Sequence, residues 1–141
     1  NEDNAHPHMV GNTVLVHNGI IENASELRKM LIDEGVVFNS ETDTEVACAL
    51  INKYYDGDGV KAIEKATKEI VGSYAFAIMF TDSDKLYATR KDSPLIIGYG
   101  EDKEFYETIE KIDDVNIILL PFIDIASAPA IFNSLTNFIN S

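Results

Sequence analysis

The stretch "SYAFAIMF", residues 73–80, is an almost unbroken run of apolar residues. A run of this length and composition is typical of a β-strand that is covered on both faces. After a turn at "TDSDK" (81–85), "LYATR" (86–90) is predicted to return as its hairpin partner, and "SPLIIGYG" (93–100) to add another strand. The centre of the chain therefore predicts a meander of strands.

Upstream of this meander the pattern changes to one strand followed by helices. "TVLVH" (13–17) is β-branched and apolar and predicts a strand, and "VVF" (36–38) predicts a short one. Helix signals are an N-cap at Asn23 or Ser25, a stop at Gly35 and a break at "DGDG". The expected helices cover residues 23–35, a segment before residue 56, and 60–71. These elements together predict a layered α+β fold.

Beyond Gly100 the composition changes again. "EDKEFYETIEKIDD" (101–114) has the pattern of a charged amphipathic helix, "VNIILL" (115–120) that of a strand, and "APAIFNSLTNFI" (128–139) that of a helix. Pro121, Asp124 and Pro129 interrupt the apolar segment too early for a membrane span. We therefore divide the chain into residues 1–100 and an unassigned helix-strand-helix tail, 101–141.

Composition limits the function classes. The 141 residues carry a net charge of −13, which disfavours binding to nucleic acid or to an anionic membrane surface. The single cysteine excludes an internal disulfide and favours a cytoplasmic location. The first residues match no signal or transit peptide, and without an initiator methionine residue 1 is not expected to be the natural start.

Three blocks in a fixed order carry a family resemblance: "NAHPH" (4–8), "VHNGIIEN" (16–23) and "SETDTEV" (40–46). Together with "GSYAFAIMF" and "LYATRKDSPLIIGYG", they resemble the glutaminase domain of class II glutamine amidotransferases. The nearest branch is the isomerising glutamine-fructose-6-phosphate aminotransferases, which make glucosamine 6-phosphate. The resemblance covers residues 1 to about 100 and implies part of a four-layer αββα sandwich of the N-terminal-nucleophile type.

The resemblance also implies a function. The parent protein is expected to hydrolyse glutamine to glutamate and ammonia and to pass the ammonia to fructose 6-phosphate in sugar-isomerase domains, without a cofactor. Two alternatives stay open: another class II amidotransferase, or a catalytically dead binding or scaffold module. An incomplete sandwich also predicts self-association through exposed edges and apolar faces.

The Asn18-Gly19 pair admits two interpretations. Asn-Gly between apolar runs is a strong signal for a hairpin turn. By resemblance, the Asn18 side-chain amide and the Gly19 backbone N–H form the oxyanion hole that stabilises the tetrahedral intermediate.

Asp43 resembles the acid that holds the α-ammonium group of the substrate, while its position before a helix also predicts an N-cap. His17 is the histidine nearest the expected oxyanion hole and is a weaker substrate-binding candidate. His6, His8 and His17 lack further ligands at suitable spacing, so no metal is expected.

Cys48 is the one thiol in the sequence, but it lies in a predicted helix between two alanines, where a cysteine is usually a small buried residue. By resemblance, the nucleophile is an N-terminal cysteine activated by its own α-amine, and the loop that binds the substrate carboxylate contains an arginine. Both would lie upstream of residue 1, so the segment alone is expected to be inactive.

Overall fold

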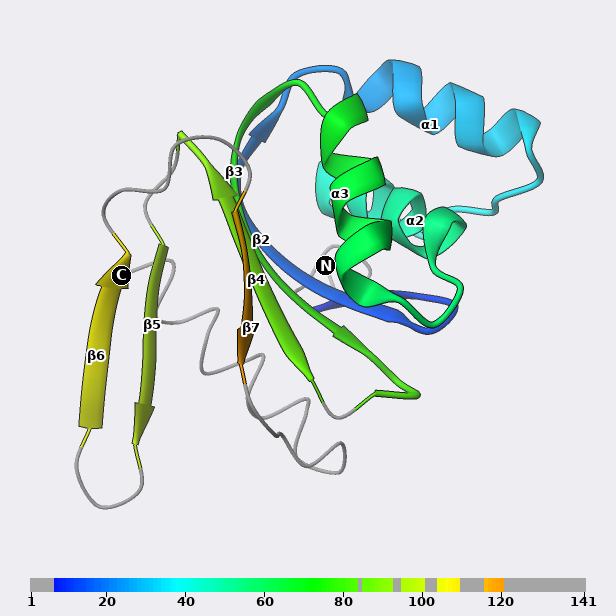
Figure 1. The fold of residues 1–141 in the computed structure, drawn as a ribbon. Helices are drawn as coiled ribbons and strands as arrows, with labels where there is room; N and C mark the ends of the chain where they lie inside the picture. The colour runs from blue at the N-terminus through cyan, green and yellow to red at the C-terminus, as the bar shows by residue number, and fades with distance from the viewer. Residues whose placement is uncertain (1–6, 84, 93–94, 101–103, 110–115, 121–141) are drawn as a thin grey trace.

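The computed structural model describes residues 7–83, 85–92, 95–100, 104–109 and 116–120. Within these residues, three helices cover one face of a five-stranded antiparallel sheet, and a two-stranded hairpin lies on the side away from the helices (Figure 1). The helices are α1 (Ala24–Asp33), α2 (Asp43–Tyr54) and α3 (Gly59–Glu69). The large sheet has the order β1 (His8–Val10), β2 (Thr13–Ile21), β3 (Gly72–Phe80), β4 (Leu86–Lys91), β7 (Asn116–Leu120), and the hairpin joins β5 (Leu95–Gly100) to β6 (Glu104–Ile109). The predicted α+β class is confirmed.

Strand β3 is the centre of the large sheet. It pairs with β2 on one side and β4 on the other, and every residue from Tyr74 to Phe80 is buried. Tyr74, Phe76, Ile78 and Phe80 belong to the core under the helices, and Ala75, Ala77 and Met79 alternate with them on the opposite face. The prediction of a strand covered on both faces is confirmed.

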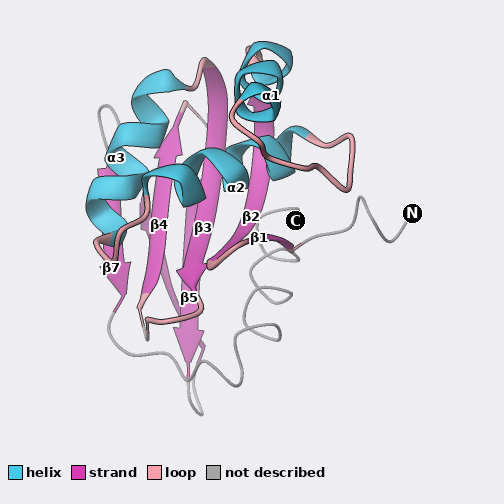
Figure 2. Ribbon diagram, turned by 90° about the vertical axis from the view of Figure 1, so that its right-hand side faces the viewer, coloured by secondary structure: helices cyan, strands magenta, loops and turns pink. Residues whose placement is uncertain are grey.

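The helices form one layer over this sheet (Figure 2). Helix α2 is buried from Thr44 to Ile51, whereas α1 and α3 bury one side each. The buried residues of the outer helices follow helical spacing, which is why the sequence pattern found them. They are Leu27 and Leu31 in α1, and Gly59, Ala62, Ile63, Ala66 and Thr67 in α3.

Strand β2 does not end at His17 as predicted. It continues to Ile21, and Asn18 and Gly19 pair with Ala75 and Tyr74 of β3. The turn interpretation of Asn18-Gly19 is therefore wrong. The β3 partner strand supplies hydrogen bonds along the whole length of β2, which local turn propensity cannot anticipate.

The short strand predicted at 36–38 is also absent from the described chain, which is irregular there. The Val36 N–H donates to the Leu31 carbonyl at 2.9 Å and helps to terminate α1, and the Phe38 ring lies under the Arg28 guanidinium. Val37 is 83% exposed. The segment therefore serves as a helix end rather than as a member of a sheet.

The helix predicted over 101–114 is wrong where the structure describes it, because Glu104–Ile109 form strand β6 and pair with β5. Phe, Tyr, Thr and Ile in this segment favour a strand once a partner strand is available. The strand predicted at 115–120 is confirmed as β7, which pairs with β4. The helix predicted at 128–139 lies outside the described residues.

No helix in the described ranges combines the length and apolarity that a membrane crossing requires.

Candidate active site

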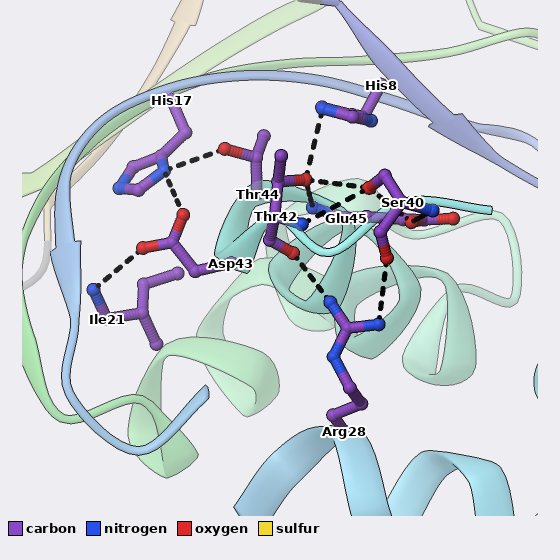
Figure 3. A network of polar contacts seen from close by, with 9 residues as sticks. All are labelled: His8, His17, Ile21, Arg28, Ser40, Thr42, Asp43, Thr44 and Glu45. Atoms are coloured by element: carbon purple, nitrogen blue, oxygen red, sulfur yellow. Dashed lines mark hydrogen bonds and ion pairs between the residues drawn. The ribbon is translucent and has the colours of Figure 1, made fainter. Parts of the chain in front are cut away.

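Asp43 is the first residue of α2, and its side chain is directed away from the helix toward β2 (Figure 3). The Ile21 backbone N–H donates a hydrogen bond to Asp43 Oδ2 at 3.2 Å, and His17 Nδ1 lies 3.8 Å from Asp43 Oδ1. The Asp43 side chain stays 33% exposed. Its carboxylate is thus anchored by backbone yet accessible to a ligand.

The helix cap is Thr42, not Asp43. Thr42 has an extended backbone, and its Oγ1 accepts a hydrogen bond from the Glu45 N–H at 3.3 Å. The N-cap alternative for Asp43 is therefore wrong, because the residue before it occupies that position and frees the Asp43 carboxylate.

Asn18 and Gly19 lie in β2 between the two residues that approach Asp43. Gly19 has a backbone φ of +117°, and a Cβ built on it would lie 2.3 Å from the Ser73 carbonyl oxygen. Only glycine fits where β2 and β3 come this close. The structure therefore holds the Asn18-Gly19 pair in a fixed backbone conformation.

His17 is buried beside this pair. Its Nδ1 lies 3.0 Å from Thr44 Oγ1, and its ring packs edge-on against Phe76, with ring centroids 5.3 Å apart. These contacts fix the orientation of the imidazole. His17 thus links β2 to the first turn of α2.

The loop before α2 is tied to the buried carboxylate of Glu45. Glu45 Oε1 accepts from the Asn39 N–H at 2.8 Å, and Oε2 accepts from the Ser40 N–H at 2.7 Å and from Ser40 Oγ at 2.6 Å. Burial would raise the pKa of Glu45, but these hydrogen bonds outweigh it and lower the pKa below its usual value. Glu45 is therefore a buried carboxylate that is ionised near neutral pH.

Arg28 of α1 holds the same loop from the other side. Its guanidinium donates to the Ser40 carbonyl at 3.0 Å and to the Thr42 carbonyl at 2.9 Å, and lies over the Phe38 ring. A planar fork of donors is suited to bridging two carbonyls in this way. Helix α1 thereby fixes the start of α2.

Cys48 lies inside the core under β1 and β2. Its Sγ donates to the Thr13 carbonyl at 3.2 Å and to the His8 carbonyl at 3.6 Å. Burial raises the pKa of the thiol to about 12. A thiol with this pKa is almost entirely protonated at neutral pH and is a poor nucleophile.

The two histidines in the described residues contact different threonines at the start of α2. His8 Nε2 contacts Thr42 Oγ1 at 3.2 Å, whereas His17 contacts α2 at Thr44, and His6 lies outside the described residues. Within the described part of the chain, no three His, Cys, Asp or Glu residues gather as metal ligands.

Glu45, Ser40 and Arg28 were missed by the sequence reasoning. Thr42 and Glu45 have the Thr-x-x-Glu spacing of a capping box, a signal that was available for Glu45. Nothing local in the sequence signals the contacts of Arg28, because they join α1 to a loop 12 and 14 residues away.

Comparison with known proteins shows the family of the chain. The model of the glutamine amidotransferase domain family matches residues 2–109, nine residues beyond the extent expected from the motifs. The glutamine-fructose-6-phosphate aminotransferase (isomerising) of Clostridium perfringens is 51% identical over 106 residues, which cover 73% of this chain and 17% of that protein. The enzyme of the same name from Fusobacterium nucleatum is 47% identical over 119 residues, covering 82% of this chain and 19% of that protein. The chain thus spans less than a fifth of these relatives.

A solved structure has the same fold. The glutamine phosphoribosylpyrophosphate amidotransferase from B. subtilis, complexed with ADP and GMP, superposes with a TM-score of 0.62 at 28% identity, covering 74% of this chain and 24% of that one. The expected N-terminal-nucleophile type of fold is supported by this neighbour. The chain belongs to the glutamine amidotransferase domain family.

Proposed function

We propose that this segment forms the part of a glutaminase site that holds the α-ammonium group of glutamine and stabilises the oxyanion of its amide. Asp43 would bind the ammonium, and the Asn18 side-chain amide and the Gly19 N–H would donate to the oxyanion. The proposal rests on one observation: the Asp43 carboxylate approaches the residues on both sides of Asn18-Gly19, at His17 and Ile21.

The chemistry of these groups suits the proposed roles. A carboxylate that is a third exposed retains attraction for an ammonium group, and this charge selects an α-amino acid over a simple amide. An uncharged amide and a backbone N–H stabilise negative charge that develops on the substrate oxygen, by roughly 3 to 4 kcal/mol for each donor. His17 would act beside them by orienting Asp43.

For the whole protein we propose the reaction named by its relatives. Glutamine would be hydrolysed to glutamate and ammonia, and the ammonia would convert fructose 6-phosphate to glucosamine 6-phosphate in sugar-isomerase domains of the same protein. This step is supported by relatives about 50% identical to the chain. A cytoplasmic location stays a prediction from the single cysteine.

Cys48 is not the nucleophile in this proposal. Its burial and its raised pKa oppose a role in attacking the substrate. Hydrolysis would require another thiol, so we expect the 141-residue chain to release no ammonia from glutamine. The same absence of activity is expected for Cys48→Ala.

The test is a titration of the chain with millimolar glutamine. NMR spectra monitor the backbone amide signals of Asn18 and Gly19 and the side-chain amide signal of Asn18. Asp43→Ala should abolish the saturable shifts, and Asp33→Ala, which removes an exposed acid at the end of α1, should retain them. The titration is repeated on a chain extended upstream to a cysteine. If neither folded protein shows shifts with glutamine, the scaffold alternative is favoured.

A further inference from the structure

The hydrogen bonds around the loop at residues 39–42 extend beyond the cap of α2. In an ordinary capping box, the carboxylate three residues into the helix returns to the N–H of the cap residue. Here the Glu45 carboxylate extends further back, to Asn39 and Ser40, and the Thr42 N–H is directed to Ser40 Oγ at 3.4 Å instead. The carboxylate therefore fixes the loop before the helix.

Arg28 completes this restraint at the peptide bond that carries Asp43. The Thr42 carbonyl, which accepts from Arg28 at 2.9 Å, belongs to the peptide unit joining Thr42 to Asp43. Ser40 Oγ lies 2.9 Å from Thr42 Oγ1 and so connects this unit to the Glu45 carboxylate. The backbone at Asp43 is consequently held from α1 and from α2 (Figure 3).

We propose that Glu45 and Arg28 are positioning residues that aim the Asp43 carboxylate and thereby set the preference of the site for substrates with an α-ammonium group. The role in substrate preference rests on the proposed function, whereas the effect on Asp43 geometry does not. Neither residue is required to touch substrate.

The loop restraint matters because the Asp43 carboxylate is held weakly by the described residues. These contribute a backbone hydrogen bond at 3.2 Å and a 3.8 Å approach to His17, and a third of the side chain is exposed. A small rotation of the Thr42–Asp43 peptide would move the carboxylate away from Ile21. Displacement of this kind acts on the contact that Asp43 would make with the ammonium group, whereas groups that bind the rest of the ligand would stay in place.

The Ile21 N–H provides a ligand-free reporter. Ile21 lies on β2, whereas Glu45 lies on α2 and Arg28 on α1, and the Ile21 N–H donates to Asp43 Oδ2. In Asp43→Ala the Ile21 amide signal loses its acceptor and shifts relative to wild type. We expect the Ile21 signal to shift in the same direction in Glu45→Gln, Ser40→Ala and Arg28→Lys. Glu26→Gln removes an exposed first-turn acid from α1 and should leave the signal unchanged.

The second readout is ligand preference. Dissociation constants of glutamine and of 4-carbamoylbutanoate, which lacks the α-amino group, are compared by NMR titration of the same variants. We expect the preference for glutamine to fall roughly tenfold in Glu45→Gln and to survive in Glu26→Gln. Ser40→Ala keeps the Glu45 charge but removes the Ser40 hydroxyl that donates to it. If Glu45→Gln does not fold, the ligand preference is measured in Ser40→Ala instead.

The outcomes are distinct. Folded variants with an unmoved Ile21 signal and an unchanged preference would overturn the positioning role and leave Glu45 with a role in stability alone. A wild-type chain with no preference between the two ligands would overturn the proposed function, and the Ile21 signal would still decide whether Glu45 and Arg28 aim Asp43.

Discussion

The Ile21 N–H donates a hydrogen bond to Asp43 Oδ2 at 3.2 Å and so joins the last residue of β2 to the first residue of α2, across 22 residues of sequence. Asn18 and Gly19 precede Ile21 on the same strand. The geometry of the candidate site therefore depends on how α2 packs on β2, and changes in that packing are expected to reach the site.

Replacing Asp43 with Asn should separate ligand binding from stability. Asn keeps an oxygen that can accept from the Ile21 N–H, so urea denaturation should show a loss of less than about 1 kcal/mol. Binding of glutamine should be lost, because the charge that attracts the ammonium is gone. Asp33→Asn is the matched control. A loss of several kcal/mol in the unfolding free energy of Asp43→Asn would mean that the Asp43 carboxylate is mainly structural.

Gly19→Ala should destabilise the fold strongly. Gly19 and Gly35 both have positive φ, but a Cβ at Gly35 meets nothing within 4 Å, whereas at Gly19 it meets the Ser73 carbonyl oxygen. Gly35→Ala should cost about 1 to 3 kcal/mol for the backbone strain alone. Gly19→Ala should exceed it by about 2 kcal/mol or more. Equal thermal denaturation curves for the two variants would refute the close approach of β2 and β3.

Asn18→Ala tests the oxyanion role without the steric clash that Gly19→Ala would cause with the Ser73 carbonyl oxygen. In a hydrolytically active protein that contains this segment, kcat should fall by about 100- to 1,000-fold with little change in KM, because the donor acts mainly on the transition state. Steady-state release of ammonia measures both constants. A raised KM with an unchanged kcat would assign Asn18 to ground-state binding instead.

The stabilising effect of Glu45 should disappear in acid. Its pKa in the folded protein lies below the usual 4.5, so its carboxylate stabilises the fold above about that pH and loses this effect as pH falls toward the lowered pKa. The difference in unfolding free energy between wild type and Glu45→Gln should be largest near pH 7 and narrow below pH 4.5.

Denaturant unfolding from pH 3 to 7 measures this difference, with Glu26→Gln as the control for an exposed first-turn acid. Gln offers one oxygen where Glu offers two, so one of the Asn39 and Ser40 N–H groups loses its acceptor at a cost of about 1 to 3 kcal/mol. A difference that does not vary with pH would contradict an ionised Glu45.

Cys48 should resist alkylation in the native protein. The thiol is fully buried, and with a pKa of about 12 it is almost entirely protonated at pH 7. Labelling with iodoacetamide, measured by mass spectrometry, should require denaturant. Rapid labelling of the folded chain would contradict the burial of Cys48 and reopen its candidacy as the nucleophile.

Much of the fold could be predicted because its signals are local. The apolar run of β3 and the helical spacing of Leu27 and Leu31 are visible in a few consecutive residues and were confirmed. The predictions failed where a distant segment decides the outcome. Strand β2 continues through Asn18-Gly19 because β3 pairs with it, and Glu104–Ile109 form a strand because β5 does.

The sequence alone determined the family, through motif blocks whose order and spacing are specific, and it named Asn18, Gly19, Asp43 and His17 as candidates. Only the tertiary structure decided that Asp43 is freed from capping by Thr42 and meets β2 at Ile21, and that Glu45 and Arg28 hold the loop before it. The physical reason is range. Propensity and periodicity act within one or two turns, whereas the Asp43 contacts join residues 22 and 26 positions apart, which only the packing of α2 on the sheet brings together.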